Sequence, residues 1–500
     1  MVEAAIQGFH ALMTVEAMLF LSLGVFLGLF GGIVPGAGGP SALAVTLPFV
    51  MLMSPVNAIA FLIGMSSVGN TGNTFTSVLV AVPGGSGSQA TVLDGFPMAQ
   101  KGEARRALSA SFMASMLGGV IGVVSLFLSI PILAPLIRSF GSPELFMFTL
   151  WGISMVGIMS SGTPIKGLIA GILGILVSTI GQDMKSGVIR FDVGYPYLWG
   201  GISIILVSLS VFAVPEAIGL ASRKKTIADP GTGLGEGGML QGIQDVFTHW
   251  WLMIRCAFIG VFVGILPGLG SSVADWFAYA HARQTVKNAE TFGTGDIRGV
   301  IAPESSNNGK EGGDLIPTLF FGIPGGSSTA LLLVGFVAVG LRPGPDMVGV
   351  QLHYTFTVLW ALAICQIAAA LICWSIIKPA SRACFLPFFI ICPIIIMLAI
   401  LSSFAANFMY DDILLLLGLS IFGFLMKAHG WPRAPFVLGF ILGPRMELYL
   451  WLAVSRYGMD WVFFPGVMVM GVVIFASLAY PIFKHYRKKK KTDILADLKP

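Results

Sequence analysis

The stretch GNTGNTFTSVLVAVPGGSGSQA, residues 69–90, places amides, hydroxyls and a Pro-Gly-Gly inside a segment, residues 17–93, that contains no Asp, Glu, Lys or Arg. Of the 500 residues in the chain, 55% are hydrophobic and 11% are charged, and the mean hydropathy is +0.87. Soluble globular domains carry about 25% charged residues. The composition therefore indicates an integral membrane protein. The polar residues at 69–90 are unusual in so apolar a segment, which suggests that they have a specific role.

Other charge-free runs can each supply the ~20 apolar residues of a spanning helix. They are residues 107–137, 193–215, 315–341, 347–377, 383–410 and 461–483. These runs lack the alternating pattern of membrane β-strands. The sequence predicts an all-α polytopic membrane protein with roughly 11 to 13 transmembrane helices.

Several classes of function are disfavoured by the residues. The five cysteines all lie in apolar runs and read as packing residues; they are Cys256, Cys365, Cys373, Cys384 and Cys392. The chain has no P-loop for ATP hydrolysis and no HExxH metal motif. The net charge of +5 arises near the ends of apolar runs and gives no reason to expect a nucleic-acid partner. We expect no enzyme activity and no cofactor apart from a coupling ion.

The two termini suggest a topology. The N-terminus, MVEAAIQGFH, has no basic n-region, so no cleavable signal is expected. The last apolar run ends in KHYRKKKK, residues 484–491. By the positive-inside rule this tail is cytoplasmic, although a basic tail can also bind anionic lipid or nucleic acid.

Three features occur twice and in the same order. GLFGGIVPGAGGPSA from Gly28 resembles GVFVGILPGLGSSVA from Gly260, with the Pro-Gly pairs 232 residues apart. SVLVAVPGGSGSQA resembles TLFFGIPGGSSTAL, with the Pro-Gly-Gly-Ser strings 241 residues apart. A polar cluster precedes each, SSVGNTGNT at 66–74 and ESSNNGKEGG at 304–313. The chain is therefore predicted to contain two repeats.

The predicted domains follow from these repeats. They are a first repeat at 1–220, a polar cytoplasmic linker at 221–248, a second repeat at 249–483 and a basic cytoplasmic tail at 484–500. The loop with Lys101, Arg105 and Arg106 is basic, whereas its counterpart near 340–348 is not. This asymmetry favours inverted repeats, with parallel repeats as the alternative.

The Pro-Gly strings predict broken helices or re-entrant hairpins, because irregular backbone at membrane depth must be buried in protein or line a wet cavity. Paired breaks at corresponding points of two halves are typical of a transporter site at the midplane. The candidate substrate-binding residues are Gly36, Gly38, Gly39, Asn70, Asn73, Thr74, Gly84, Gly85, Ser86, Gly268, Gly270, Ser271, Asn307, Asn308, Lys310, Gly325, Gly326 and Ser327. The candidate Na+ ligands are Asn70, Thr71, Asn73, Ser305 and Asn307. Helix packing alone, or dimerisation through small residues, is the alternative role of these clusters.

The charged residues near the second cluster are open to more than one interpretation. Lys310 can face an anionic substrate or water. Glu311 and Asp314 are expected at a water-exposed hairpin base, with Asn307 and Asn308 deeper. Asp94 is expected to cap a helix at the interface, with proton coupling as the alternative.

The motifs together resemble one family. GLFGGIVPGAGG, VLVAVPGGSGSQATVLDGFPMAQKGEARRAL and APESSNNGKEGGDLIPTLFFGIPGGSSTALLLVGFVAVGLRPGP are similar to the large permease subunit of the tripartite tricarboxylate transporters, over nearly the whole chain. The resemblance implies a bacterial inner-membrane protein that works with a small four-helix membrane subunit and a periplasmic solute-binding protein. It also implies ion-driven uptake of carboxylates, citrate in the best-known member, and a fold related to carboxylate transporters with two inverted repeats.

Two strings depart from the family pattern. The first polar cluster reads MSSVGNTGNTF in place of a YYGAQYGGS-like string, and the second reads PESSNNGKEGG in place of PEAANNA. Both changes fall at the expected site, so they bear on which carboxylate is carried. The sequence thus predicts a Na+- or proton-driven carboxylate symporter that works by alternating access. An uncoupled channel-like or scaffold subunit is the alternative, and an intramembrane enzyme using Lys310 near Ser305 and Ser306 ranks third.

Overall fold

The structure is a computed structural model. It describes residues 1–33, 39–81, 86–138, 141–159, 164–183, 186–221, 238–266, 270–383, 393, 396, 397, 399–401, 403, 404 and 409–476. Most of these residues lie in helices. In these ranges the strands are β1 (Gly181–Gln182) and β2 (Ile189–Arg190), which pair antiparallel with Gly181 opposite Arg190. The predicted all-α membrane class is confirmed.

Within the described ranges, four helices are long and apolar enough to cross a membrane on their own. They are Val15–Ile33, Ala104–Pro135, Leu352–Ser375 and Pro435–Tyr457. The pair α11 (Met239–Thr248) and α12 (Trp250–Ile265) is a fifth candidate, bent by 78°. The sequence estimate is larger because breaks divide some apolar runs into shorter helices, and because most of the run 383–410 lies outside the described residues.

Residues 1–137 and 205–424 form one compact unit. Its first-half elements are α1 (Val2–Leu12), α2 (Val15–Ile33), α3 (Gly39–Val50), α4 (Pro55–Val80), the 3-10 turn η1 (Ser86–Ser88), α5 (Val92–Gln100) and α6 (Ala104–Arg138). The connecting elements are α9 (Ile204–Ser208), the π-helical turn η3 (Leu209–Ala213) and α10 (Val214–Ala221). The second half adds α11, α12, α13 (Gly270–Thr285), η4 (Ala289–Thr291), α14 (Arg298–Phe321), α15 (Ser327–Ala338), η5 (Pro345–Val348), α16 (Leu352–Ser375), α17 (Ile377–Ala383) and α19 (Tyr410–Ala428).

Helices end at the predicted breaks in both halves. The helices α4 and α14 end at Ala81 and Gly322, which occupy equivalent repeat positions and both adopt a left-handed conformation, with φ of 55° and 67°. The N–H of Ala81 donates to the carbonyl of Thr76, and that of Gly322 donates to the carbonyl of Pro317, again equivalent positions. A left-handed residue is the common way to terminate a helix. The two helices therefore stop by the same local geometry.

The two halves also pack their helices in the same register. A methyl group on Gly28 of α2 would clash with the carbonyl oxygen of Met65 on α4, and one on Gly260 of α12 would clash with that of Ser306 on α14. One turn further along, Gly32 and Gly264 meet the carbonyls of Gly69 and Lys310 in the same way. Only glycine allows backbones to approach this closely. Equivalent glycines in the two halves thus make equivalent helix–helix contacts.

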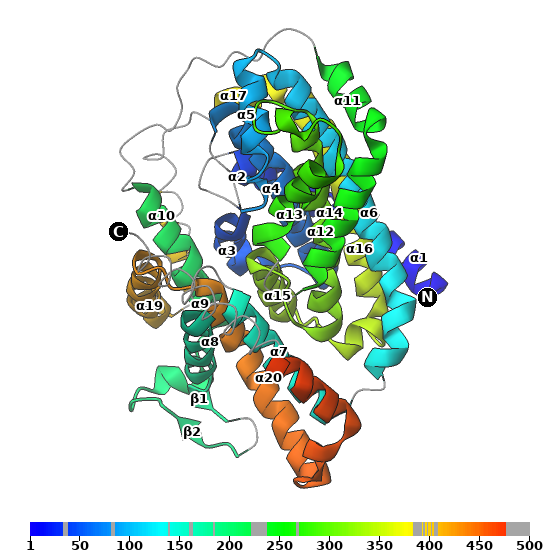
Figure 1. Cartoon of the computed structure of the whole chain (residues 1–500). Coiled ribbons are helices and arrows are strands. Elements are labelled where there is room, and N and C mark those ends of the chain that lie inside the picture. The colour runs from blue at the N-terminus through cyan, green and yellow to red at the C-terminus, as the bar shows by residue number, and fades with distance from the viewer. Residues whose placement is uncertain are drawn as a thin grey trace, which may run out of the picture. The chain divides into compact units, whose positions relative to one another are not determined.

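Helices from the two halves of the chain pack against one another. The helix α15 of the second half packs on α3 of the first, and α13 of the second half packs on η1 of the first. Helix α16 packs on α4, while Gly118 and Gly122 of α6 contact the backbone of α14 at Ser305 and Gly309. Figure 1 shows the blue helix α4 beside the green helix α14. The two repeats therefore interlock within one unit.

The described residues of 138–204 and 425–476 form a second compact unit. It contains α7 (Ser142–Met159), α8 (Pro164–Ser178), the β1–β2 hairpin, η2 (Pro196–Gly200), α20 (Arg433–Tyr457), η6 (Asp460–Phe463) and a helix at Pro465–Ala476. The helices α8 and α20 approach at Gly174 and Gly439, which meet the carbonyls of Phe436 and Gly171. Both predicted repeats contribute residues to this unit. The predicted domain boundaries stay a prediction, and residues 222–237 of the linker and the 484–500 tail lie outside the described residues.

Candidate functional site

Three hydrogen bonds join α4 to α14 in the first unit. Asn70 Nδ2 donates to Glu311 Oε1 at 2.6 Å, Asn308 Nδ2 donates to Thr71 Oγ1 at 3.0 Å, and Thr74 Oγ1 donates to Glu304 Oε2 at 3.0 Å. As the residue number rises along α4 it falls along α14, so the two equivalent helices run antiparallel. Asn70 and Glu311 are 241 residues apart and occupy equivalent repeat positions. The contact between α4 and α14 thus includes two residues at equivalent positions of the predicted repeats.

Glu304 lies at one end of this contact and is fully buried. Besides Thr74, its carboxylate accepts hydrogen bonds from Thr91 Oγ1 at 2.7 Å and Ser115 Oγ at 2.9 Å. Thr91 precedes α5 and Ser115 lies on α6. Sequence reasoning did not select these two hydroxyls, because nothing in the sequence near them indicates that they meet α14.

Glu311 lies at the other end of the contact between α4 and α14. Its Oε2 accepts a hydrogen bond from Gln366 Nε2 at 2.5 Å, and Gln366 Oε1 accepts one from Asn308 at 2.8 Å. Gln366 is 2% exposed on α16. It too was missed, although an amide within the charge-free run 347–377 was the available signal. The amide of Gln366 links α16 to two polar residues of α14.

Lys310 and Asn307 form a third part of the site. Lys310 is 2% exposed, and its ammonium donates to Asn307 Oδ1 at 2.7 Å. No described acid makes an ion pair with Lys310. Gly87 of the first-half break lies against both side chains, since a methyl group there would contact the Lys310 ammonium and clash with the Asn307 amide. A buried ammonium thus lies beside a glycine-rich break from the other repeat.

Four buried polar atoms near these groups have no hydrogen-bond partner among the described residues. They are Asn73 Oδ1, Asn307 Nδ2, Asn308 Oδ1 and Asp314 Oδ1. Buried polar groups are almost always paired in proteins, and leaving one unpaired costs about 1–3 kcal/mol. The arrangement therefore has both donors and acceptors to offer to a ligand or to water.

The expected placement of Glu311 and Asp314 at a water-exposed base was wrong. They are 8% and 5% exposed, well inside α14. The Lys-Glu-Gly-Gly string resembles a loop, but α14 runs through it without interruption. Gly312 and Gly313 allow the backbones of α6 and α12 to approach there, and this close packing removes the carboxylates from water.

The other predicted residues are distributed as follows. Ser305 Oγ donates to the carbonyl of Ala302 on its own helix. Gly325 lies beside Asp314, the N–H of Gly326 donates to Thr329 Oγ1, and Ser327 begins α15. Gly39, Gly270 and Ser86 begin α3, α13 and η1, and Ser271 follows Gly270 in α13. Gly36, Gly38, Gly84, Gly85 and Gly268 lie outside the described residues.

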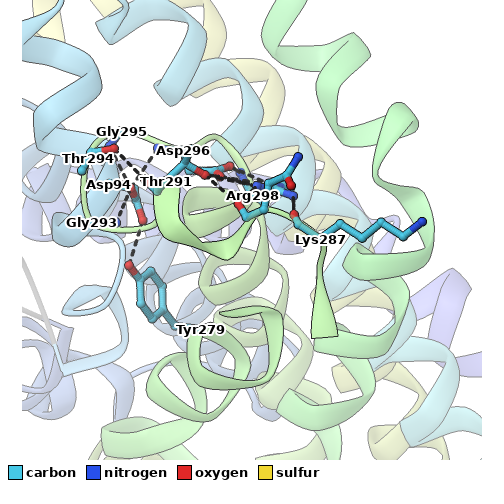
Figure 2. Close-up of polar contacts among 10 residues, drawn as sticks. Asp94, Tyr279, Lys287, Thr291, Gly293, Thr294, Gly295, Asp296 and Arg298 are labelled. Atoms are coloured by element: carbon cyan, nitrogen blue, oxygen red, sulfur yellow. Dashed lines mark hydrogen bonds and ion pairs between the residues drawn. The ribbon is translucent and has the colours of Figure 1, made fainter. Parts of the chain in front are cut away.

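Asp94 joins the two repeats rather than capping its own helix (Figure 2). It is fully buried and accepts hydrogen bonds from the backbone N–H groups of Gly293, Gly295 and Asp296 at 2.8–2.9 Å. The Tyr279 hydroxyl of α13 donates to its other oxygen at 2.9 Å. All four donors belong to the second half, so Asp94 fixes the loop that leads into α14 against α5.

A charged pair supports the same loop from outside. Arg298 Nη2 lies 2.6 Å from Asp296 Oδ2, and Arg298 also donates to the carbonyls of Lys287 and Asn288. Burial alone would raise the pKa of Asp296, but the hydrogen bonds from Arg298 and Thr291 outweigh it and the pKa lies below its usual value. The hydrogen bond to Asp296 raises the pKa of Arg298. The loop is thus held by charged hydrogen bonds on both of its faces.

The second unit has a cavity of about 840 Å³ between α8, the β1–β2 hairpin and α20. Its cation, Arg190, lies 2.9 Å from Asp183 and 2.8 Å from Glu447. Hydrogen bonding to Glu447 raises the pKa of Arg190. With two acids already beside its arginine, this cavity suits an anionic ligand less well than the Lys310 region.

Comparison with known proteins agrees with this architecture. Residues 18–438 match the model of the tripartite tricarboxylate transporter TctA family. A protein of Agrobacterium vitis, described as an uncharacterized 52.8 kDa protein in the TAR-I ttuC' 3' region, is 30% identical over 453 residues, covering 89% of this chain and 88% of that protein. A second Agrobacterium vitis protein, described as an uncharacterized protein in the TAR-II ttuC' 3' region, is 30% identical over 191 residues, covering 38% of this chain and 79% of that protein.

No solved structure matches the chain. The family match covers most of the sequence and includes both polar clusters, both sets of breaks and the helices that carry them. This chain belongs to the TctA family, the large membrane subunits of tripartite tricarboxylate transporters.

Proposed function

We propose that this chain is the ion-coupled permease of a binding-protein-dependent carboxylate uptake system. The observation that carries this proposal is the buried ammonium of Lys310, whose hydrogen bond goes to the neutral Asn307 amide. A cation and an unpartnered amide N–H beside a glycine-rich break suit a carboxylate, because charge-assisted hydrogen bonds are the strong ones. In this proposal the substrate binds against α14 and the Gly87 loop.

The proposed mechanism is alternating access between inverted repeats. The equivalent helices α4 and α14 run antiparallel and touch at equivalent residues, Asn70 and Glu311. Equivalent helices that run in opposite directions are expected of repeats related by a two-fold axis in the membrane plane, and transporters with such repeats bind substrate where the repeats meet. A rearrangement around the contact of α4 with α14 would then expose Lys310 to each side in turn.

The proposal includes the partners and the setting that the family implies. These are a small four-helix membrane subunit, a periplasmic solute-binding protein, and the bacterial inner membrane with the C-terminus in the cytoplasm. A Na+ or proton gradient would drive uptake. The buried acids Glu304, Glu311 and Asp314 favour coupling over a passive channel, since intramembrane ionisable groups mark ion pathways.

The test is uptake into proteoliposomes that contain this chain and its small partner, with the cognate binding protein outside. A panel of labelled di- and tricarboxylates is offered with an inward Na+ gradient, with a pH gradient, and with neither. We expect accumulation against a concentration gradient for at least one carboxylate. Equilibration without accumulation would identify a channel and reject coupled transport.

A matched pair of variants locates the substrate site. Lys310→Gln keeps a neutral hydrogen-bond donor but removes the charge, so uptake should fall by about tenfold or more. The control is Lys166→Gln in the second unit, where the exposed lysine donates to the carbonyl of His429. Equal uptake by the Lys310 variant and the wild-type protein would exclude Lys310 from substrate binding.

A further inference from the structure

Glu304 is enclosed by hydroxyl groups. Its Oε2 accepts from Thr74 at 3.0 Å and Ser115 at 2.9 Å, and its Oε1 accepts from Thr91 at 2.7 Å. All four side chains are completely buried. The hydroxyls come from α4, from the turn before α5 and from α6, so three separate parts of the first repeat converge on one carboxylate of the second.

The charge of this carboxylate is not compensated by a described side chain. No described Lys, Arg or His forms an ion pair with Glu304. Lys310 lies on a different face of α14 and donates to Asn307. Asp275, also fully buried, accepts the N–H of Ala90, next to Thr91, and so adds negative charge nearby. A buried charge is strongly unfavourable unless an opposite charge accompanies it.

The chemistry of the surrounding atoms selects the kind of cation. Each hydroxyl has two lone pairs and rotates freely, so an oxygen that donates to the carboxylate can turn a lone pair toward an ion that the carboxylate shares. Oxygen ligands suit hard cations. A proton binds a single carboxylate oxygen and needs none of the hydroxyls as a ligand, whereas a hard cation takes several oxygen ligands, so the number of converging oxygens favours such a cation.

We propose that Glu304, Thr74, Thr91 and Ser115 bind a single Na+ ion. This inference rests on the proposed function, for which it specifies the coupling-ion site, and that site is separate from the Lys310 region. These ligands differ from the Na+ ligands that the sequence predicts, among which Asn70 and Thr71 also hydrogen-bond between α4 and α14. Because the ligands come from both repeats, bound Na+ favours the arrangement in which α14 is held against α4 and α6.

Binding is measured without substrate and without transport. The purified full chain in detergent is heated in increasing NaCl, with choline chloride keeping the ionic strength constant, and in matched KCl and pH series. A ligand that binds only the folded state raises the melting temperature with its concentration. We expect Na+ to raise the melting temperature and K+ to have a much weaker effect.

Matched variants test each ligand. Glu304→Gln should abolish the Na+ effect, and Thr74→Val and Ser115→Ala should each weaken the apparent affinity by about tenfold or more. The controls are Thr76→Val and Ser111→Ala, on the same helices. Thr76 and Ser111 are equally buried, but their hydroxyls donate to the backbone carbonyls of Asn73 and Ala107. These controls should keep wild-type affinity for Na+.

Several outcomes would overturn the proposal. One is a Glu304→Gln protein whose melting temperature still rises with Na+ as much as that of the wild-type protein. Another is a protein that ignores Na+ but shows a pH-dependent melting temperature that Glu304→Gln removes, which would identify the cation as a proton. If Glu304→Gln does not fold, equal Na+ affinities of Thr74→Val and Thr76→Val would reject the site. If Na+ binds at Glu304 but no carboxylate is taken up, the proposed function is refuted and the Na+ site stands. If uptake is driven by Na+ but Glu304→Gln binds Na+ normally, the Na+ site is refuted and the proposed function stands.

Discussion

At the scale of single residues, the buried polar side chains serve two purposes. Some connect the repeats through satisfied hydrogen bonds, as Asp94 does with four donors from the second half. Others, such as Asn73 and Asn307, carry unpartnered polar atoms in places where water has little access. The first kind is expected to control the stability of one conformation, and the second kind is expected to control binding.

Asp94→Asn should loosen the loop that precedes α14. The amide has one acceptor oxygen in place of a charged carboxylate, so the N–H groups of Gly293, Gly295 and Asp296 lose their charged partner, at a cost of about 2–4 kcal/mol. Hydrogen exchange of residues 286–297 should accelerate by at least roughly tenfold. The measurement is hydrogen–deuterium exchange by mass spectrometry on the purified chain.

Two further variants control this prediction. Tyr279→Phe removes one of the four hydrogen bonds and should give a smaller acceleration. Asp346→Asn changes an exposed carboxylate whose nearest described cation, Arg342, is 3.8 Å away, and it should leave the loop unchanged. Unaltered exchange in Asp94→Asn would mean that the loop is held by other contacts.

At the scale of helices, the repeats are built on close backbone contacts. Gly28→Ala and Gly260→Ala should each destabilise the protein by about 1–3 kcal/mol, because each methyl group would displace α2 or α12 from its partner helix. The control is Gly418→Ala on α19, where nothing lies within 4 Å of the added methyl group. Alanine favours helix more than glycine does, so Gly418→Ala should not lower the melting temperature. A similar loss at all three positions would contradict this account of the packing.

The equivalent helix ends allow a paired test. Ala81 has a left-handed conformation with φ of 55°, which costs a residue with a Cβ about 1–2 kcal/mol, whereas its equivalent is Gly322. Ala81→Gly should therefore raise the free energy of unfolding by about 0.5–1 kcal/mol, and Gly322→Ala should lower it by a similar amount. Thermal melting of the two variants decides the matter. Changes of the same sign in both would show that the two ends are not equivalent.

Sequence reasoning found the helix breaks, because Pro-Gly strings terminate helices whatever surrounds them. It also singled out Asn70, Thr71 and Asn308, because amides and hydroxyls are unusual in so apolar a part of the chain. The structure joins them by hydrogen bonds between α4 and α14, and their binding role stays a prediction. It missed Thr91, Ser115 and Gln366, since their roles depend on contacts with residues far away in the sequence. It misplaced Glu311 and Asp314 because a charged, glycine-rich string is ordinarily a loop, and here close helix packing decides the outcome instead.

At the scale of the whole molecule, the antiparallel pairing of α4 and α14 predicts the orientation of the loops. Single cysteines replacing Lys101 and Arg342, in a background without the native cysteines, should react with a membrane-impermeant maleimide from opposite sides of the membrane. Lys101 follows the helix after the first break, and Arg342 occupies the corresponding place in the second half. Labelling of both positions from the same side would contradict inverted repeats and support parallel repeats.

The reciprocal packing of the repeats has a consequence for how such a chain arose. Helix α6 covers α14, and α16 covers α4, so neither half encloses its own central helix. An ancestral half-length protein with this packing would have needed a second copy before either copy was complete. Gene duplication and fusion would then have joined two interdependent subunits that already worked as a pair. Consistent with that history, separately expressed halves of this chain should accumulate only when they are produced together.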